Sequence, residues 1–397
     1  MSAEFEQPNA NDLLEHNQEV EKLWQAYRRG EPWRVPVIFN YGIRCRLLDP
    51  SLNIEGYTFQ QYFKDPDVML DAQLKHLHFK AFNLWRDEPM GYPAEGWQVF
   101  IDFQNTFEAP WFGCPIRYYA DQVPDSVEIL RECKSLLYEM HIPEPLSAPI
   151  MQRAIEFYEY FKERCPELEF MGRPVLPPRS LPGAGTDGPF TVAFKLRGAT
   201  ELCLDIYEDP QYVHDLLSFI TEATIQRIQA VRQYLIDKKD VRSDEFEIPG
   251  WGFADDAAEM LSPELYREFV LPYHKRLVDT FAGDGPVSVH MCGDASHIYP
   301  LLVDELGANS IDTGFPVDHG KLREQLGPDV EILGGPSIML LREGPEEAVK
   351  EEVRRILKSG IMTGKRFILR EGNNVAPGTP LRHLRAMYAA AKEYGRY

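Results

Sequence analysis

Pro286-Val-Ser-Val-His-Met-Cys-Gly293 carries the clearest fold signal in the chain. Alternating, β-branched residues lead into a histidine and a cysteine two positions apart, a glycine follows, and residues 296–306 form an amphipathic segment. A buried strand followed by polar residues, a turn and a helix is how an α/β protein presents chemistry at the carboxyl end of a strand. We therefore expect functional side chains directly after this strand.

His290 and Cys292 are the first candidate metal ligands. Residues i and i+2 of an extended segment lie on the same face, so the imidazole and the thiol can converge on one atom. Nitrogen and sulfur together suit a soft or borderline metal, zinc first. The alternative is structural, with His290 capping a turn and Cys292 packing as a small hydrophobic side chain. Two ligands do not complete a site, so other parts of the chain must supply the rest.

Composition limits the classes of function. The chain has 397 residues, which is enough for one large α/β barrel or two ordinary domains. Its 62 acidic and 42 basic side chains give a formal charge of −20, which opposes binding to nucleic acid or to an anionic membrane. The first residues show no signal-peptide pattern and no apolar run is long enough to span a bilayer, so we expect a cytoplasmic protein.

The cysteines argue against a disulfide framework. They are scattered without a CxxC pair or regular spacing, so we expect reduced thiols, most of them structural. They are Cys45, Cys114, Cys133, Cys165, Cys203 and Cys292.

Strand patterns and helix patterns alternate along much of the chain. The expected strands are 33–39, 80–85, 96–102, 246–253, 286–292, 308–312, 330–335 and 366–371. The expected helices are 11–29, 58–63 with 65–77, 190–196, 210–235, a helix capped by Ser262, 296–306, 320–326, 345–360 and 380–394. The proline-rich stretch 174–189 reads as a long loop. Repeated strand–helix units indicate a parallel sheet with right-handed crossovers.

The strand count comes close to eight, which makes a TIM-type (β/α)8 barrel the leading fold and a doubly wound sheet the second. The GxGxxG match at residues 183–188 lies in the proline-rich stretch and not directly after an expected strand, and no GxxxxGK[ST] motif follows a strand, which weakens the nucleotide-binding interpretation of the second fold. We expect residues 1–32 to form a helical extension outside the main core, and residues 33–397 to form a single barrel domain.

In a barrel, residues at the carboxyl strand ends form one ring, and the candidate site residues come from it. Glu371 and Asn373 could complete a metal site with His290 and Cys292, although Asn is a poor zinc ligand and Glu371 could be salt-bridged instead. The candidate catalytic carboxylates are Asp102, Asp255 and Glu371, with capping as the alternative role of Asp102.

Arg44 and Arg46 follow the first expected strand and are two residues apart. They could bind a substrate carboxylate, or they could be solvated beside an acidic surface. Together with Asn373 they are the candidate substrate-binding residues.

Four motifs resemble the uroporphyrinogen decarboxylase superfamily, and the resemblance extends from about Val35 to Tyr397. They are Gly188-Pro-Phe-Thr-Val-Ala-Phe-Lys-Leu-Arg-Gly198, Leu261-Ser-Pro-Glu-Leu-Tyr-Arg-Glu-Phe-Val-Leu-Pro-Tyr273, His290-Met-Cys-Gly293 and Ala376-Pro-Gly-Thr-Pro380. The superfamily contains decarboxylases and zinc-dependent methylcobamide:thiol methyltransferases, and the resemblance implies a single TIM-type barrel.

The decarboxylase branch carries an arginine-rich signature near its N-terminus, and residues 40–46 contain Arg44 and Arg46 but not that signature. Asp102 stands at the position resembling that branch's central Asp. The branch's histidine before the Pro-Gly-Thr-Pro motif is replaced here by Asn373.

The methyltransferase branch uses His-x-Cys and a second Cys near the C-terminus as zinc ligands. His290 and Cys292 match the first part, whereas Asn373 stands at about the place of the second Cys. The resemblance therefore implies that Glu371, Asp255 or Asp256 replaces it, or that the metal is bound weakly or not at all.

Three functional hypotheses follow. The first is a zinc-assisted methyltransferase that works with a corrinoid-binding partner protein and a small-molecule methyl donor or acceptor. The second is a cofactor-independent decarboxylase or lyase, in which Asp102 stabilises a cationic intermediate and Arg44 and Arg46 bind carboxylates. The third is a non-catalytic ligand-binding barrel. No Asp-x-His-x-x-Gly motif is present, so a corrinoid would come from the partner, and both a monomer and a homodimer are compatible with the sequence.

Overall fold

A five-stranded parallel sheet forms the centre of the fold in the computed structural model, which describes residues 9–246 and 249–397. The strand order is β10-β9-β8-β7-β6, so each strand lies beside its neighbour in sequence. The strands are β6 (Trp251–Ala254), β7 (Val287–Met291), β8 (Ala308–Thr313), β9 (Glu331–Gly334) and β10 (Phe367–Leu369). The order is the one expected from consecutive strand–helix units.

The two faces of the sheet have different residues because side chains alternate along a strand. In β7, Val287, Val289 and Met291 are buried, whereas Ser288 is exposed and His290 is partly exposed. The register pairs His290 with Ala254 of β6 on one side and with Asp312 of β8 on the other. The carboxyl ends of these three strands are therefore level.

Single bridges extend the sheet at both edges. Val37 pairs in parallel with Leu369, and the Ile38 amide donates to the Leu369 carbonyl at 3.0 Å. Asp187 pairs in parallel with Ala254 at the other edge. The remaining strands are short: β1 (Trp97–Gln98) and β4 (Glu169–Phe170) flank β5 (Arg173–Leu176), and β2 (Ile116–Arg117) pairs with β3 (Asp125–Ser126).

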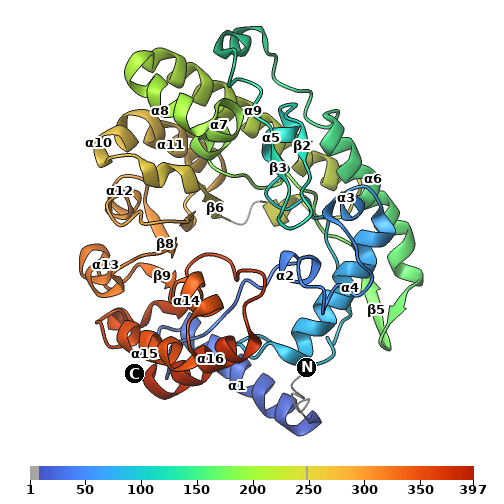
Figure 1. Cartoon of the computed structure of the whole chain (residues 1–397), viewed down its shortest axis with the longest axis vertical. Coiled ribbons are helices and arrows are strands. Elements are labelled where there is room, and N and C mark those ends of the chain that lie inside the picture. The colour runs from blue at the N-terminus through green and yellow to red at the C-terminus, as the bar shows by residue number, and fades with distance from the viewer. Residues whose placement is uncertain (1–8, 247–248) are drawn as a thin grey trace.

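Helices cover the outer face of the sheet, where Figure 1 shows α11, α12 and α13 outside the strands. The helices of the C-terminal half are α10 (Pro263–Leu265), α11 (Leu271–Phe281), α12 (Tyr299–Asp304), α13 (His319–Leu326), α14 (Ile338–Glu343), α15 (Glu346–Leu357) and α16 (Leu381–Tyr394). The N-terminal half has α1 (Ala10–Arg28), α2 (Arg44–Leu47), α3 (Phe59–Tyr62), α4 (Pro66–Asn83), α5 (Glu108–Trp111), α6 (Pro149–Arg164), α7 (Pro189–Arg197), α8 (Ala199–Glu208) and α9 (Pro210–Asp237).

Helix α1 packs along the lower edge of the molecule in Figure 1, next to α16. The Trp24 indole N–H donates to the Asp87 carbonyl, and Glu19 forms an ion pair with Lys392 of α16 at 2.8 Å. Val20 and Leu23 of this helix are buried. The division into an N-terminal extension and a barrel domain stays a prediction.

The expected helices are found, but one expected strand is wrong. Residues 80–83 belong to α4, which Asp65 caps and Pro66 begins, so residues 80–85 do not form a strand. The helix continues because it extends the buried face of residues 69–81, including Met69 and Ala81. The first expected strand, 33–39, makes only isolated bridges. Of the expected strand 96–102 only Trp97–Gln98 forms a strand, and the first residues of the expected loop 174–189 belong to β5. The expected strand 246–253 begins at Trp251, and residues 247–248 lie outside the described residues.

All six cysteines are free thiols, as their scattered spacing predicts. Within residues 9–246 and 249–397, no helix is long and apolar enough to cross a membrane.

Candidate metal centre

His290, Cys292 and Asp256 form the one group of potential metal ligands found in the described part of the chain. One ligand atom from each lies within 4.8 Å of the others. The His290 Nε2 atom is 3.3 Å from the Cys292 Sγ atom and 3.6 Å from the Asp256 Oδ1 atom. The Cys292 amide also donates to Asp256 Oδ1 at 3.0 Å, which fixes the loop after β6 against the end of β7.

These separations fit zinc. Zinc bonds of about 2.0–2.3 Å at tetrahedral angles place ligand atoms about 3.3–3.6 Å apart. One nitrogen, one sulfur and one carboxylate oxygen form a borderline-soft donor set, and three protein ligands leave one position open, as in catalytic zinc sites. The donor set of this structure therefore fits the metal that the family resemblance implies.

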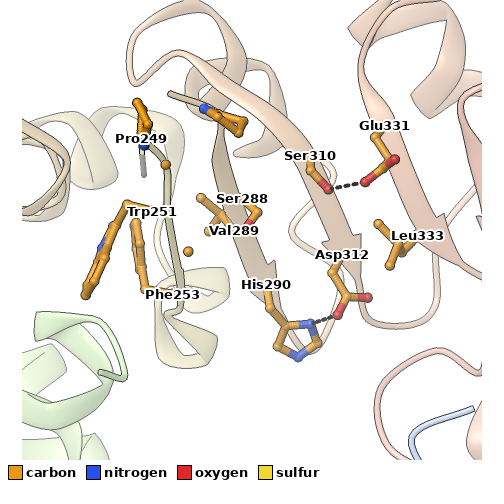
Figure 2. A pocket seen from close by; sticks show the side chains of 13 residues that line it. Pro249, Trp251, Phe253, Ser288, Val289, His290, Ser310, Asp312, Glu331 and Leu333 are labelled. Atoms are coloured by element: carbon orange, nitrogen blue, oxygen red, sulfur yellow. Dashed lines mark hydrogen bonds and ion pairs between the residues drawn. The ribbon is translucent and has the colours of Figure 1, made fainter. Parts of the chain in front are cut away.

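Asp312 holds His290 from the opposite side of the ring. Its carboxylate lies 3.0 Å from His290 Nδ1 (Figure 2). This contact leaves Nε2 on the side of Cys292 and Asp256. Arg370 donates to the same carboxylate. A carboxylate on the far nitrogen is the usual support of a metal-bound histidine, because it fixes the tautomer and the ring orientation.

The site is electrostatically suited to a cation. Burial raises the pKa of the Cys292 thiol, and the carboxylates of Asp256, Glu259 and Asp312 raise it further. Burial opposes protonation of His290, but the hydrogen bond and charge of Asp312 outweigh it and raise the His290 pKa. A metal ion would reverse both effects, because it favours the thiolate and the neutral imidazole.

A cavity of ≈440 Å³ opens beside this group, and we name it the Cys292 cavity. Its lining includes Arg44, Asn105, Asp187, Thr191, Phe194, Lys195, Asp256, Glu259, Met260, His290, Cys292, Asn373 and Asn374. Gly293 makes room for one of these side chains, because an added Cβ would lie 1.3 Å from the Glu259 Oε2 atom.

Asp255, predicted as a catalytic carboxylate, is placed in a buried hydrogen-bond network away from this group. Its carboxylate accepts from the amides of Phe190 and Thr191 at 3.2 and 2.7 Å, at the first turn of α7. It also lies 2.7 Å from His274 Nε2, and His274 Nδ1 lies 2.9 Å from the Tyr266 hydroxyl. The geometry assigns Asp255 to holding α7 against β6 and α11.

Asp102 lines a neighbouring cavity of ≈370 Å³, which we name the Asp102 cavity. Its carboxylate accepts from the Tyr62 hydroxyl at 3.0 Å and from the Gln104 amide at 2.8 Å. Burial raises the Asp102 pKa against these hydrogen bonds. The structure thus brings Asp102 near the Cys292 cavity but not into the ligand group.

The two candidate arginines diverge. Arg44 lines the Cys292 cavity and donates to Gln104 and Asn105, whereas Arg46 pairs with Glu55 at 3.2 Å. Both belong to α2, and residues two apart on a helix do not face each other.

Glu371 and Asn373 are also separated. Glu371 is fully buried, accepts from the Asn40 amide at 3.0 Å and pairs with Arg370, and it is not part of the ligand group. Burial raises its pKa to about 7. Asn373 lines the Cys292 cavity with a left-handed backbone, φ 101°.

Sequence reasoning missed Asp187. This residue ends the proline-rich loop, immediately before Gly188 and α7, and lines both the Cys292 and the Asp102 cavities. The signal was an acidic residue followed by Gly-Pro at a helix start, which marks a strand-to-helix turn.

A third cavity of ≈750 Å³ lies along the strands that lead to His290 (Figure 2). Ser288, Ser310 and Glu331 line it, and the Ser310 hydroxyl donates to Glu331 at 3.1 Å. His290 and Asp312 border one end of it.

Comparisons with known proteins identify the family. The family model described as uroporphyrinogen decarboxylase (URO-D) matches residues 18–394. The chain belongs to this family. Within the URO-D family, it is 29% identical to a methylated-thiol–coenzyme M methyltransferase of Methanosarcina mazei, over 52% of this chain and 51% of that protein. It is 26% identical to the methylcobamide:CoM methyltransferase MtbA of Methanosarcina acetivorans, over 77% of this chain and 82% of that protein.

Decarboxylases of the family are similar as well. The uroporphyrinogen decarboxylase of Chlorobaculum parvum is 31% identical over 38% of this chain and 40% of that protein. The chain thus spans about half the length of the methylated-thiol–coenzyme M methyltransferase and 40% of the length of this decarboxylase. A solved methyltransferase structure from Methanosarcina mazei superimposes with a TM-score of 0.62 over 94% of this chain and 98% of that one, at 19% identity, which supports the same fold.

Proposed function

We propose that this protein is a zinc-assisted methyltransferase that moves a methyl group to or from a corrinoid carried by a partner protein. The observation that carries the proposal is the Asp256, His290 and Cys292 group, supported by Asp312 and open to a cavity. The similarity to the two Methanosarcina methyltransferases gives independent support.

The roles of the residues follow from their positions. His290 Nε2, Cys292 Sγ and Asp256 would hold zinc, and Asp312 orients the imidazole. Bound zinc would lower the pKa of a thiol substrate and favour its thiolate. In transfer to a thiol, the sulfur lone pair would form the bond to the methyl carbon, the electron pair of the cobalt–carbon bond would stay on the partner's corrinoid, and the thiol proton would go to solvent.

We further propose that the sheet closes into a (β/α)8 barrel. The edge bridges at Val37 and Asp187 give the sheet a neighbouring segment on each side, and β1 runs toward Asp102 between them in sequence. In such a barrel the ligand group and both cavities would lie at the carboxyl mouth, where a corrinoid protein could dock.

The test is the demethylation of a free methylated corrinoid in the presence of a thiol. The reaction is run under anaerobic conditions and is monitored by the change in absorbance of the corrinoid. The Cys292→Ser variant should lose more activity than the roughly 10–100-fold that loss of an outer-shell partner costs. Cys133→Ser is the matched control, because Cys133 is exposed and lies outside the Cys292 cavity. Equal activity of Cys292→Ser and the wild type would refute the proposal.

Decarboxylation is the second candidate, and Asp102 supports it. A buried carboxyl with a raised pKa at the edge of a cavity is the kind of group that acid–base or cation-stabilising chemistry uses. Asp102→Asn should abolish carbon dioxide release from a carboxylated substrate and leave metal content unchanged. Of the two arginines expected to bind such carboxylates, Arg46 is already paired with Glu55, which favours the first proposal.

A further inference from the structure

The Cys292 cavity and the Asp102 cavity meet at two shared residues, Asn105 and Asp187. The two cavities are therefore adjacent, with Asp187 on their common wall. The metal-ligand group lines the Cys292 cavity, and Asp102 and Glu108 line the Asp102 cavity.

Asp187 is held rigidly at this junction. Its backbone bridges to Ala254 of β6, and its amide donates to the buried Glu108 carboxylate. The next residue must be glycine, because a Cβ on Gly188 would lie 2.2 Å from the Asp255 Oδ2 atom. The position of Asp187 thus depends on a sheet edge and a helix start, which are more precise supports than a free loop.

The carboxylate of Asp187 is unpaired among residues 9–246 and 249–397, where neither a hydrogen bond nor an ion pair reaches it. Cations nearby are already engaged. Lys195 pairs with Asp125 at 3.2 Å, and two nitrogen atoms of Arg44 donate to Gln104 and Asn105.

The charges around the two adjacent cavities are mostly negative. The carboxyl groups that line them are Asp102, Glu108, Asp187, Asp256 and Glu259, and the cationic side chains are Arg44 and Lys195. Arg227 neutralises Glu108 through a buried ion pair. Burial and the neighbouring carboxylates of Glu108 and Asp256 raise the Asp187 pKa to about 7, and the charge of Lys195 only partly opposes them.

We propose that Asp187 binds a cationic group of the small substrate, such as an ammonium, while the reacting atom lies at the Asp256, His290 and Cys292 group. Only the placement of the reacting atom at the metal-ligand group rests on the proposed function. It excludes a sulfonate or carboxylate at the Asp187 end, because an anion there would face an unpaired carboxylate in a partly desolvated cavity.

Two thiols of the same length and opposite terminal charge provide the test: 2-aminoethanethiol, with an ammonium, and 2-mercaptoethanesulfonate. Binding is measured by isothermal titration calorimetry on the purified protein at pH 8, where Asp187 is ionised. The wild type should bind the aminothiol at least about tenfold more tightly than the sulfonate, and Asp187→Asn should weaken aminothiol binding about tenfold. Asp279→Asn, the same change at an exposed position of α11, should leave both affinities unchanged.

The outcomes separate this inference from the proposed function. Equal binding of the two thiols, no binding of either, or a charge preference that survives in Asp187→Asn would overturn the role of Asp187. The thiol end is tested separately by Cys292→Ser. If that variant keeps the wild-type metal content and thiol affinity, the proposed metal centre is wrong. This result would leave the role of Asp187 standing if the variant still prefers the ammonium-bearing thiol.

Discussion

At the scale of single residues, the orientation of His290 depends on its neighbours. Asp312 lies on Nδ1, and Cys292 and Asp256 lie on the side of Nε2. The His-x-Cys pair could be predicted from the two-residue period of a strand. For the third ligand the sequence left Glu371, Asp255 and Asp256 as alternatives, because the choice of Asp256 depends on the register of β6 against β7.

The Asp312→Asn variant tests this orientation. An amide supports the imidazole less strongly than a carboxylate, so we expect metal affinity to fall about 10–100-fold while the fold is retained. Competition with a chromogenic chelator measures the affinity, and circular dichroism checks the fold. An unchanged affinity would mean that Asp312 does not support a metal ligand.

Glu371 predicts a pH dependence of stability. Its folded-state pKa is about 7, above the usual value for Glu, so the folded protein holds a proton that the unfolded chain has released between about pH 4.5 and 7. The stability that Glu371 contributes to the folded protein is fully present below the pKa that Glu371 has in the unfolded chain, and it is lost as pH rises through 7.

Glu371→Gln should therefore gain stability relative to the wild type as pH rises, on the order of 2 kcal/mol between pH 5 and 8. Urea unfolding at the two pH values measures the difference. A difference that does not grow with pH would show that Glu371 is ionised in the folded protein at low pH.

At the scale of elements, the start of α7 depends on a residue far away in sequence. Asp255 accepts the amides of Phe190 and Thr191, and these contacts explain why the residue before the candidate ligand Asp256 is structural. The sequence placed both acids at a strand end. Because adjacent residues point in opposite directions, only one of the two can face the site, and the sequence could not show which one.

Replacing Asp255 by alanine leaves His274 and two buried amides without their partner. We expect a loss of about 3–5 kcal/mol, measured by urea unfolding. Asp256→Asn, at the neighbouring and more exposed position, should cost less than about 1 kcal/mol. Similar losses in both variants would contradict the assignment of Asp255 to the fold and Asp256 to the site.

Helix α4 shows another limit of sequence patterns. Residues 80–85 contain apolar and aromatic side chains that favour a strand, but the helix that begins at Pro66 continues to Asn83. Packing of the helix face outweighs the local preference of these residues.

At the scale of the whole molecule, Asp87 joins segments that are far apart in sequence. Its carboxylate accepts from Arg34 at 2.6 and 2.8 Å, from the Val37 amide at 2.7 Å and from the Tyr388 hydroxyl at 3.0 Å. The Trp24 indole donates to its carbonyl. Contacts between such distant segments have no local sequence signal, so this junction could not be predicted.

Asp87→Ala leaves Arg34 buried without its main partner. We expect a loss of about 3–5 kcal/mol in the free energy of unfolding. Glu19→Ala, which removes the more exposed partner of Arg34, should cost about 1 kcal/mol or less. Equal costs would show that Asp87 is not the centre of the junction.

The metal content of the protein tests the central claim most directly. Protein purified without a metal-affinity tag is analysed by plasma mass spectrometry as the wild type and as the Cys292→Ser, Asp256→Asn and Glu371→Gln variants. We predict near-stoichiometric zinc in the wild type and in Glu371→Gln, and a loss of most of it in the other two. Absence of metal from the wild type, or retention of zinc in both Cys292→Ser and Asp256→Asn, would contradict the proposed metal centre.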